Sequence, residues 1–191
     1  MNPNPRYSTP AIAIHWLAAV MILCAFVLGI NMVDLPMSPT RLKLINWHKW
    51  LGASILALSL LRLLWRATHR PPADLPMPRW QQRAAHLTHG AMYLLFLAVP
   101  LVGWTYSSAA GFPVVVFGVL PLPDLVGPDE ALSHLLKPLH GQLAMVLLAL
   151  IAMHLGAALK HQLIDRDGIL WRMIPRVSER GTAPAAPYKQ L

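Results

Sequence analysis

The chain has 191 residues, of which 55% are hydrophobic and 13% are charged, and its mean hydropathy is +0.47. Because a soluble domain carries about 25% charged residues, this composition excludes an ordinary soluble domain and predicts a membrane protein. The formal net charge is +8, but the basic residues cluster at the ends of apolar segments, which argues against nucleic-acid binding and for a role in membrane orientation.

Four apolar stretches follow one another, and each is close to the ~20 residues that a helix needs to cross the hydrocarbon core. They are expected at about residues 11–30, 47–65, 86–106 and 139–160. The first is too long for the apolar region of a signal peptide, and no small-x-small cleavage site follows it, so we expect it to be retained. Loops rich in proline separate the stretches at about residues 31–46, 70–80 and 107–138. The sequence therefore predicts an all-α integral membrane four-helix bundle.

The distribution of lysine and arginine predicts the orientation of this bundle. When alternate helix ends are assigned to two sides, one side receives twelve of these residues and the other receives four. The four are Arg41, Lys43, Lys49 and Lys137. By the positive-inside rule, the N- and C-termini and the second loop are cytoplasmic. We expect residues 1–176 to form the membrane domain and residues 177–191, which are polar and rich in alanine and proline, to form a disordered cytoplasmic tail.

Four histidines fall at two depths of the predicted bundle. His140 and His154 are fourteen residues apart in the fourth stretch, so they share a helix face and differ in depth by about 21 Å. His48 lies near the outer end of the second helix, at the depth of His140. His15 lies near the cytoplasmic end of the first helix, at the depth of His154. Because a haem iron with two axial imidazoles takes one ligand from each side of the macrocycle, the pattern predicts two stacked bis-histidine haems.

Roles without haem compete for the same histidines. A zinc site or a proton relay is the main competitor, although zinc favours closer, mixed ligands and does not need two levels four turns apart. His86 and His89 open the third stretch at i, i+3 spacing. They are candidates for a quinone pocket or a proton relay, they are equally candidates for interfacial positions, and one of them is an alternative inner ligand.

The remaining polar residues near the predicted spans have expected roles as well. Arg62 lies among leucines, where it is a candidate partner for a haem propionate or a side chain that snorkels to the cytoplasmic surface. His69, His134 and His161 are expected at the interface. The single cysteine, Cys24, excludes an internal disulfide, and no Cys-x-x-Cys-His motif for c-type haem is present.

Short motifs around these histidines form a specific set. They are Ala13-Ile14-His15-Trp16-Leu17, Ile45-Asn46-Trp47-His48-Lys49, Ala85-His86-Leu87-Thr88-His89, Leu139-His140-Gly141, Met153-His154-Leu155 and the closing Leu170-Trp171-Arg172-Met173-Ile174-Pro175-Arg176. Together they resemble the bacterial cytochrome b561 family over about residues 5–176. The resemblance implies a four-helix cytochrome of the bacterial inner membrane with two haem b groups. By carry-over from the family, His48 and His140 bind one haem, and His15 and His154 bind the other.

The resemblance also implies a function in electron transfer. A characterised family member is a superoxide oxidase, which passes electrons from superoxide to ubiquinone, and related four-helix cytochromes are membrane subunits of hydrogenases and formate dehydrogenases. The leading hypothesis is therefore a superoxide:ubiquinone oxidoreductase that oxidises superoxide at the periplasmic face and reduces ubiquinone. The four basic outer residues are a candidate funnel for the anion, or else snorkelling side chains. The alternatives are an electron conduit between the quinone pool and a partner dehydrogenase or hydrogenase-like protein, and a haem-free transporter of metal or protons.

Overall fold

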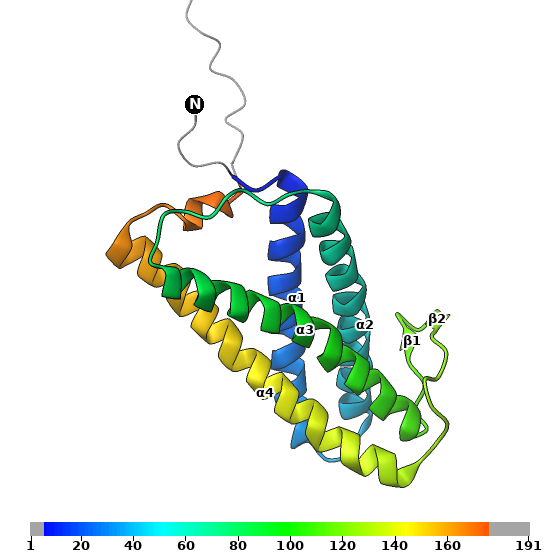
Figure 1. The fold of residues 1–191 in the computed structure, drawn as a ribbon. Coiled ribbons are helices and arrows are strands. Elements are labelled where there is room, and N and C mark those ends of the chain that lie inside the picture. Colours follow the sequence, from blue (N-terminus) through cyan, green and yellow to red (C-terminus); the bar gives the residue numbers. More distant parts are fainter. Residues whose placement is uncertain (1–5, 176–191) are drawn as a thin grey trace, which may run out of the picture.

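A computed structural model describes residues 6–175, and four long helices make up most of it (Figure 1). The helices are α1 (Thr9–Val33), α2 (Pro39–Thr68), α3 (Arg79–Ala109) and α4 (Glu130–Lys160). The shorter elements are an antiparallel pair, β1 (Val115–Val116) and β2 (Leu120–Pro121), a π-helical turn, η1 (His161–Asp165), and a 3-10 turn, η2 (Leu170–Arg172). All four long helices are apolar and long enough to cross a membrane, which confirms the predicted all-α membrane bundle. The predicted tail at 177–191 lies outside the described residues.

The helices are longer than the apolar stretches that predicted them. α2 begins eight residues and α4 nine residues before the expected positions, so the predicted loops at 31–46 and 107–138 are shorter in the structure. Each of these helices has an N-cap whose side-chain oxygen accepts a backbone N–H of the first turn: Ser38 before α2 and Asp129 before α4. An apolar run marks the part of a helix inside the hydrocarbon, whereas the capping residue decides where the helix begins.

The four helices pack as two adjacent pairs, α1 with α2 and α3 with α4, and the second pair is inclined to the first (Figure 1). The buried core lies between the pairs and takes residues from every helix: Ala18, Ile22, Ile55, Met92, Leu95, Phe96 and Leu147. The outward faces carry exposed leucines and valines, including Leu23, Val27, Leu64 and Leu94. Apolar side chains inside and outside are typical of helices that contact lipid.

The segment after α4 crosses the end of the bundle where α1 begins (Figure 1). The indole of Trp16 donates to the Met173 carbonyl at 2.7 Å, and the buried guanidinium of Arg172 donates to the Ala73 carbonyl at 2.8 Å. The backbone N–H of Tyr7 donates to the Arg172 carbonyl at 3.3 Å. These bonds hold three segments together at this end of the bundle: the chain around the start of α1, the loop between α2 and α3, and the segment after α4.

The connection between α3 and α4 forms a small hairpin against α2 at the opposite end. β1 and β2 pair there, and the indole of Trp50 donates to the Val115 carbonyl at 2.7 Å. The ammonium of Lys49 donates to the Phe112 carbonyl at 3.1 Å. The hairpin therefore fixes the part of α2 that directly follows His48.

Candidate functional site

The residues that face the interior form three layers, seven residues apart along each helix. Seven residues are nearly two helical turns, so such positions share a face and differ in depth by about 10 Å. We name the layers after the predicted orientation. The outer layer contains Gly29, His48, Gly103 and His140. The middle layer contains Ile22, Ile55, Phe96 and Leu147. The inner layer contains His15, Arg62, His89 and His154.

The outer pair is His48 of α2 and His140 of α4. Their ring centroids lie 6.0 Å apart and their planes are at 89° to one another. Two imidazoles that share one metal, each at a metal–nitrogen distance of about 2.0 Å, place their ring centres about 6 Å apart. The structure thus brings together two predicted ligands from different helices at the spacing that a single iron between them requires.

Both outer histidines are oriented by backbone carbonyls of the neighbouring helix. The Nδ1–H of His48 donates to the Ala25 carbonyl at 3.0 Å, and the Nδ1–H of His140 donates to the Val99 carbonyl at 3.0 Å. Because a carbonyl only accepts, the ring proton of each neutral imidazole lies on Nδ1 and the lone pair of Nε2 is left for a metal. This tautomer and ring orientation are what a metal-ligating histidine needs.

Two glycines make room for these rings. A Cβ atom at Gly29 would lie 3.3 Å from Cε1 of His48. A Cβ atom at Gly103 would lie only 2.9 Å from Cε1 of His140, which is closer than non-bonded carbon atoms tolerate. Each glycine follows the accepting carbonyl by four residues in the same helix. Neither glycine was predicted from the sequence, although each is fourteen residues from a histidine of its own helix, the spacing that identified His140 and His154.

A cavity of about 690 Å³ opens beside the outer pair. Both histidines line it, and the rest of its wall is mainly apolar, with Phe26, Ile55 and Phe96 among its members. Its volume lies within the ~300–1,000 Å³ range that is usual for cofactor pockets. Two free imidazole nitrogens over an apolar cavity fit haem b, which combines an apolar macrocycle with two axial positions on iron.

The inner pair has a similar spacing but different neighbours. The ring centroids of His15 and His154 lie 6.4 Å apart, with 68° between the planes. The ring of His89 is 5.2 Å from that of His154, which is shorter than the spacing of about 6 Å for two imidazoles on one metal. The distances therefore favour His15 over His89 as the partner of His154, and they place His89 beside the pair.

Arg62 contacts the inner pair directly. Its guanidinium donates to Nδ1 of His15 at 3.0 Å and lies 5.3 Å from the ring centre of Tyr93. Arg66, one turn further along α2, lies 5.7 Å from the same ring. Because a guanidinium only donates, Nδ1 of a neutral His15 is the acceptor and its ring proton lies on Nε2. His15 therefore has the opposite tautomer to the two outer histidines.

His86 and His89 face different surroundings, although they are three residues apart. They lie within α3, seven and ten residues after its first residue Arg79, rather than at its start. Nε2 of His86 is 3.0 Å from Oδ2 of Asp74 in the loop before α3, and this side chain is 59% exposed. The hydrogen bond from Gln82, and then the contacts with His86, lower the pKa of Asp74. Of the two histidines, His89 alone reaches the inner layer.

The residues predicted as an anion funnel lie at the outer end of α2 and α4: Arg41, Lys43, Lys49 and Lys137. Arg41 donates to the Leu35 carbonyl at 2.7 Å, and the ammonium of Lys43 lies 5.0 Å from the ring centre of Trp47. The ammonium of Lys49 donates to the Phe112 carbonyl before β1. Within residues 6–175, none of the four has a carboxylate within 4.0 Å, although Asp124 in the loop before α4 acts on the charge of Lys49 over a longer distance.

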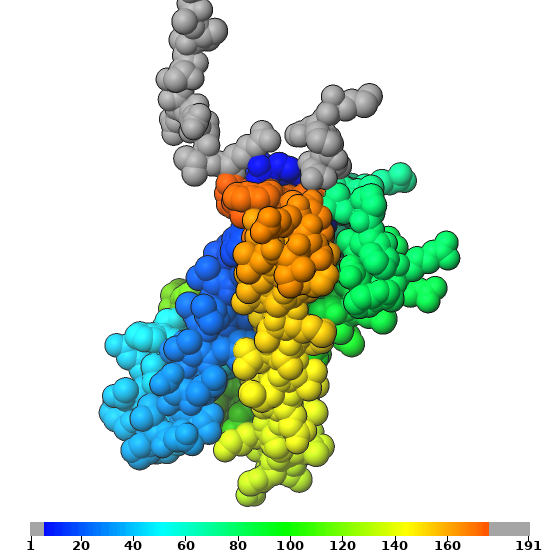
Figure 2. All heavy atoms as spheres, turned by 90° about the vertical axis from the view of Figure 1, so that its left-hand side faces the viewer, coloured from blue at the N-terminus to red at the C-terminus, as the bar shows by residue number. Residues whose placement is uncertain are grey.

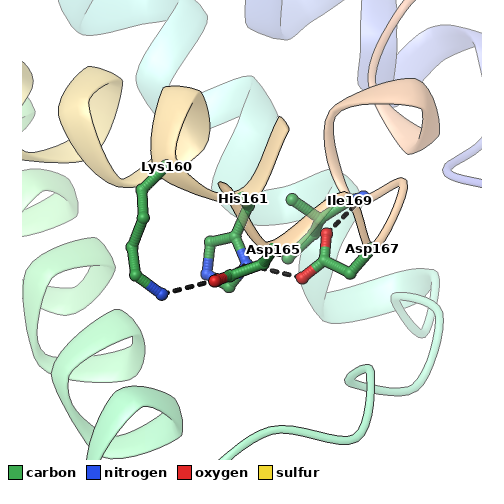
Figure 3. A network of polar contacts seen from close by, with 5 residues as sticks. All are labelled: Lys160, His161, Asp165, Asp167 and Ile169. Carbon is green, nitrogen blue, oxygen red and sulfur yellow. Dashed lines mark hydrogen bonds and ion pairs between the residues drawn. The ribbon is translucent and has the colours of Figure 1, made fainter. Parts of the chain in front are cut away.

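His161, which was expected at the interface, is enclosed in a polar network after α4 (Figure 3). Its side chain is 13% exposed, and Nδ1 lies 2.5 Å from Oδ2 of Asp167 and 3.2 Å from Oδ2 of Asp165. Lys160 pairs with Asp165 at 2.5 Å, and Asp167 also accepts the backbone N–H of Ile169. The π-helical turn brings these groups together, and one lysine and one histidine face two carboxylates. We assign the network to closing the turn, where the chain caps this end of the molecule (Figure 2).

The chain matches known proteins over nearly its whole length. A family model described as "Prokaryotic cytochrome b561" matches residues 6–176. "Cytochrome b561 homolog 2" of Escherichia coli (strain K12) is 36% identical, covering 93% of this chain and 95% of the relative. "Cytochrome b561 homolog 1" of the same organism is 32% identical, covering 90% and 98%. "Probable superoxide oxidase CybB" of Yersinia pestis is 30% identical, covering 91% and 98%. The chain belongs to the prokaryotic cytochrome b561 family of haem b-binding membrane electron carriers.

Proposed function

We propose that the protein holds two haem b groups, one between His48 and His140 and one between His15 and His154, and passes electrons across the bacterial inner membrane. The observation that carries this proposal is the pairing of four histidines in two layers, each pair at about 6 Å between ring centres. When bound, haem supplies reversible one-electron chemistry at its iron. The predicted orientation, with both termini cytoplasmic, places the outer pair on the periplasmic side.

The chain contributes ligand orientation and separation of the two sites. The carbonyls of Ala25 and Val99 hold the outer imidazoles with Nε2 free. The apolar middle layer keeps water and polar groups out of the space between the pairs. Fourteen residues of α4 separate its two ligands, a rise of about 21 Å. Electrons therefore cross most of the hydrocarbon thickness between the two sites.

Arg62 is proposed to pair with a propionate of the inner haem. If Nε2 of His15 held a haem iron, the ring proton of this residue would lie on Nδ1, where a guanidinium would no longer be a suitable neighbour because it has no acceptor. A carboxylate is the best replacement partner for a planar, permanently charged group inside a membrane. Tyr93, whose face lies 5.3 Å from the guanidinium carbon, holds Arg62 close to the site during this exchange.

The proposed reaction is superoxide:ubiquinone oxidoreduction. Two superoxide anions each give one electron at the outer site and leave as dioxygen, and one ubiquinone accepts two electrons and two protons to become ubiquinol. The basic residues at the outer end, none of which forms an ion pair within the described residues, support an anionic donor because they raise its encounter rate. A relative that covers 91% of the chain is named as a probable superoxide oxidase, which also supports it. His89 beside the inner pair and His86 at the surface are proposed to serve the quinone or its protons.

Rapid mixing of the purified, oxidised protein with superoxide tests this reaction. We expect the reduced b-type bands to appear within the mixing experiment, to disappear when ubiquinone is added, and not to appear when superoxide dismutase is present. A Lys49→Gln, Lys137→Gln double variant should slow the superoxide step with a weaker dependence on salt. If superoxide leaves the haem bands oxidised, superoxide is not the donor.

A second candidate is an electron conduit between the quinone pool and a redox partner protein. It is favoured by the names of the two Escherichia coli relatives, which are more similar to this chain than the superoxide oxidase and are described only as cytochromes. In this case ubiquinol should reduce the haems of the purified protein while superoxide should not. The haem-free transporter is not proposed, because the family binds haem b.

A further inference from the structure

The two ligand pairs differ most in the groups that touch Nδ1. In the outer layer, both Nδ1 atoms donate to backbone carbonyls at 3.0 Å. A hydrogen bond of this kind increases the electron density that an imidazole gives to a metal, and so stabilises the oxidised iron. In the inner layer, Nδ1 of His15 contacts a guanidinium at 3.0 Å instead. A fixed positive charge next to a ligand disfavours the oxidised iron, which carries one more positive charge than the reduced iron.

The positive charge at the inner layer is not cancelled by protein groups. Within the described residues, neither Arg62 nor Arg66 has a carboxylate within 4.0 Å. Both guanidinium groups instead lie over the ring of Tyr93, at 5.3 and 5.7 Å from its centre. Arg62 is half-buried in the inner layer, where a charge is screened less than in water.

We propose that Arg62 makes the inner site the more readily reduced of the two, and so directs electrons from the outer site to the inner site. This inference rests on the proposed two-haem function. In each transfer the outer iron loses one electron and the inner iron gains it, and no bond is broken. The direction of the effect does not depend on whether a propionate pairs with Arg62: without the arginine, the unpaired carboxylate would add a negative charge beside the iron and again favour its oxidised form.

Potentiometric titration of the purified protein, followed through the reduced b-type bands, tests the proposal without superoxide or quinone. The Arg62→Gln variant removes the charge, and we expect a lower midpoint potential for one haem only. The Arg62→Lys variant keeps the charge and should restore most of the original value. The Arg66→Gln variant is the matched control: Arg66 also contacts Tyr93 but lies one turn further along α2, away from the inner layer, so the shift should be smaller and in the same direction. The titration of His140→Ala, which retains only the inner haem, identifies the component that moves.

Each outcome decides the proposal. Unchanged midpoints in Arg62→Gln, a shift of the outer component, or an inner site that is harder to reduce than the outer site in the unmodified protein would overturn it. If Arg62→Gln fails to hold the inner haem, the titrations of the unmodified protein and of His140→Ala decide, and an inner midpoint below the outer one overturns the proposal. A protein with fewer than two haems contradicts the proposed function itself. If the protein has two haems and shows the expected shift but is not reduced by superoxide, this inference stands and only superoxide as the donor is rejected.

Discussion

The outer and inner layers use the same helices and nearly the same ligand spacing, but they surround the ligands differently. Ring centroids are 6.0 Å apart in the outer pair and 6.4 Å apart in the inner pair. Beside the outer ligands are two glycines and two backbone carbonyls that accept from the imidazoles, whereas beside the inner ligands are Arg62 and His89. The helical repeat therefore determines where the ligands lie, and the residue on the adjacent helix determines their charge environment and tautomer.

Removing one ligand from each layer is the strongest test of this comparison. We expect His140→Ala to lose the outer haem and His154→Ala to lose the inner haem, each leaving one of the two, because an iron with one imidazole has lost half of its protein ligation. The measurement is the haem content per chain, with the reduced spectrum. His86→Ala is the control and should retain both haems, since its side chain faces Asp74 instead of the inner layer. Loss of the inner haem in His89→Ala but not in His15→Ala would mean that the inner pair is assigned to the wrong helix.

The glycine positions test the outer layer alone. In Gly103→Ala, the new methyl group would lie 2.9 Å from the ring of His140, so either the ring or α3 has to move. Overpacking of this kind costs about 1–3 kcal/mol, and we expect weakened or lost outer haem with the inner haem unchanged. Gly90→Ala in the same helix is the matched control, because nothing lies within 4 Å of its added Cβ atom. Equal haem binding in both variants would show that the close approach at Gly103 is not required.

The sequence predicted the spans and the depth of each histidine because both follow from local rules: apolar length and the helical period. It did not predict where α2 and α4 begin, because Ser38 and Asp129 act as caps outside the apolar runs. It also missed Gly29 and Gly103: the fourteen-residue spacing from His15 and His89 places them on the interior face, but the ring that each one faces belongs to another helix. The tautomer of His15 has the same origin: it depends on Arg62 of another helix.

The middle layer should serve both sites equally. Leu147 is 4% exposed between the two ligands of α4, and truncation of a buried leucine typically costs about 2–5 kcal/mol. We expect Leu147→Ala to lower the thermal midpoint of the purified protein and to weaken both haems to a similar extent. Leu159→Ala makes the same chemical change at a position of the same helix that is 46% exposed, and should have little effect. Selective loss of one haem in Leu147→Ala would mean that this residue belongs to a single site.

The smallest expected effect concerns the loop before α3, where Asp74 contacts His86. The hydrogen bond from Gln82, followed by the contacts of His86, lowers the pKa of Asp74 in the folded protein below its unfolded value. A carboxyl group with a lowered pKa contributes stability that is present above its unfolded pKa and is lost as the pH falls through the folded pKa. Amide hydrogen exchange in the first turns of α3, where the N–H groups of Gln81 and Gln82 donate to the Pro78 carbonyl, should therefore quicken, after correction for its intrinsic pH dependence, as the pH falls below about 4.

Two variants separate Asp74 from other groups that titrate in the same range. Asp74→Asn cannot titrate, so its corrected exchange should vary less with pH and should already be fast at neutral pH. Gln82→Ala removes the largest cause of the lowered pKa and should move the transition to higher pH while keeping its shape. Because Asp74 is largely exposed, the change should stay within the loop and the first turns of α3 and leave haem content unaltered. Loss of the inner haem in Asp74→Asn would instead mean that this contact, by holding His86 at the surface, helps to decide which histidine enters the inner layer.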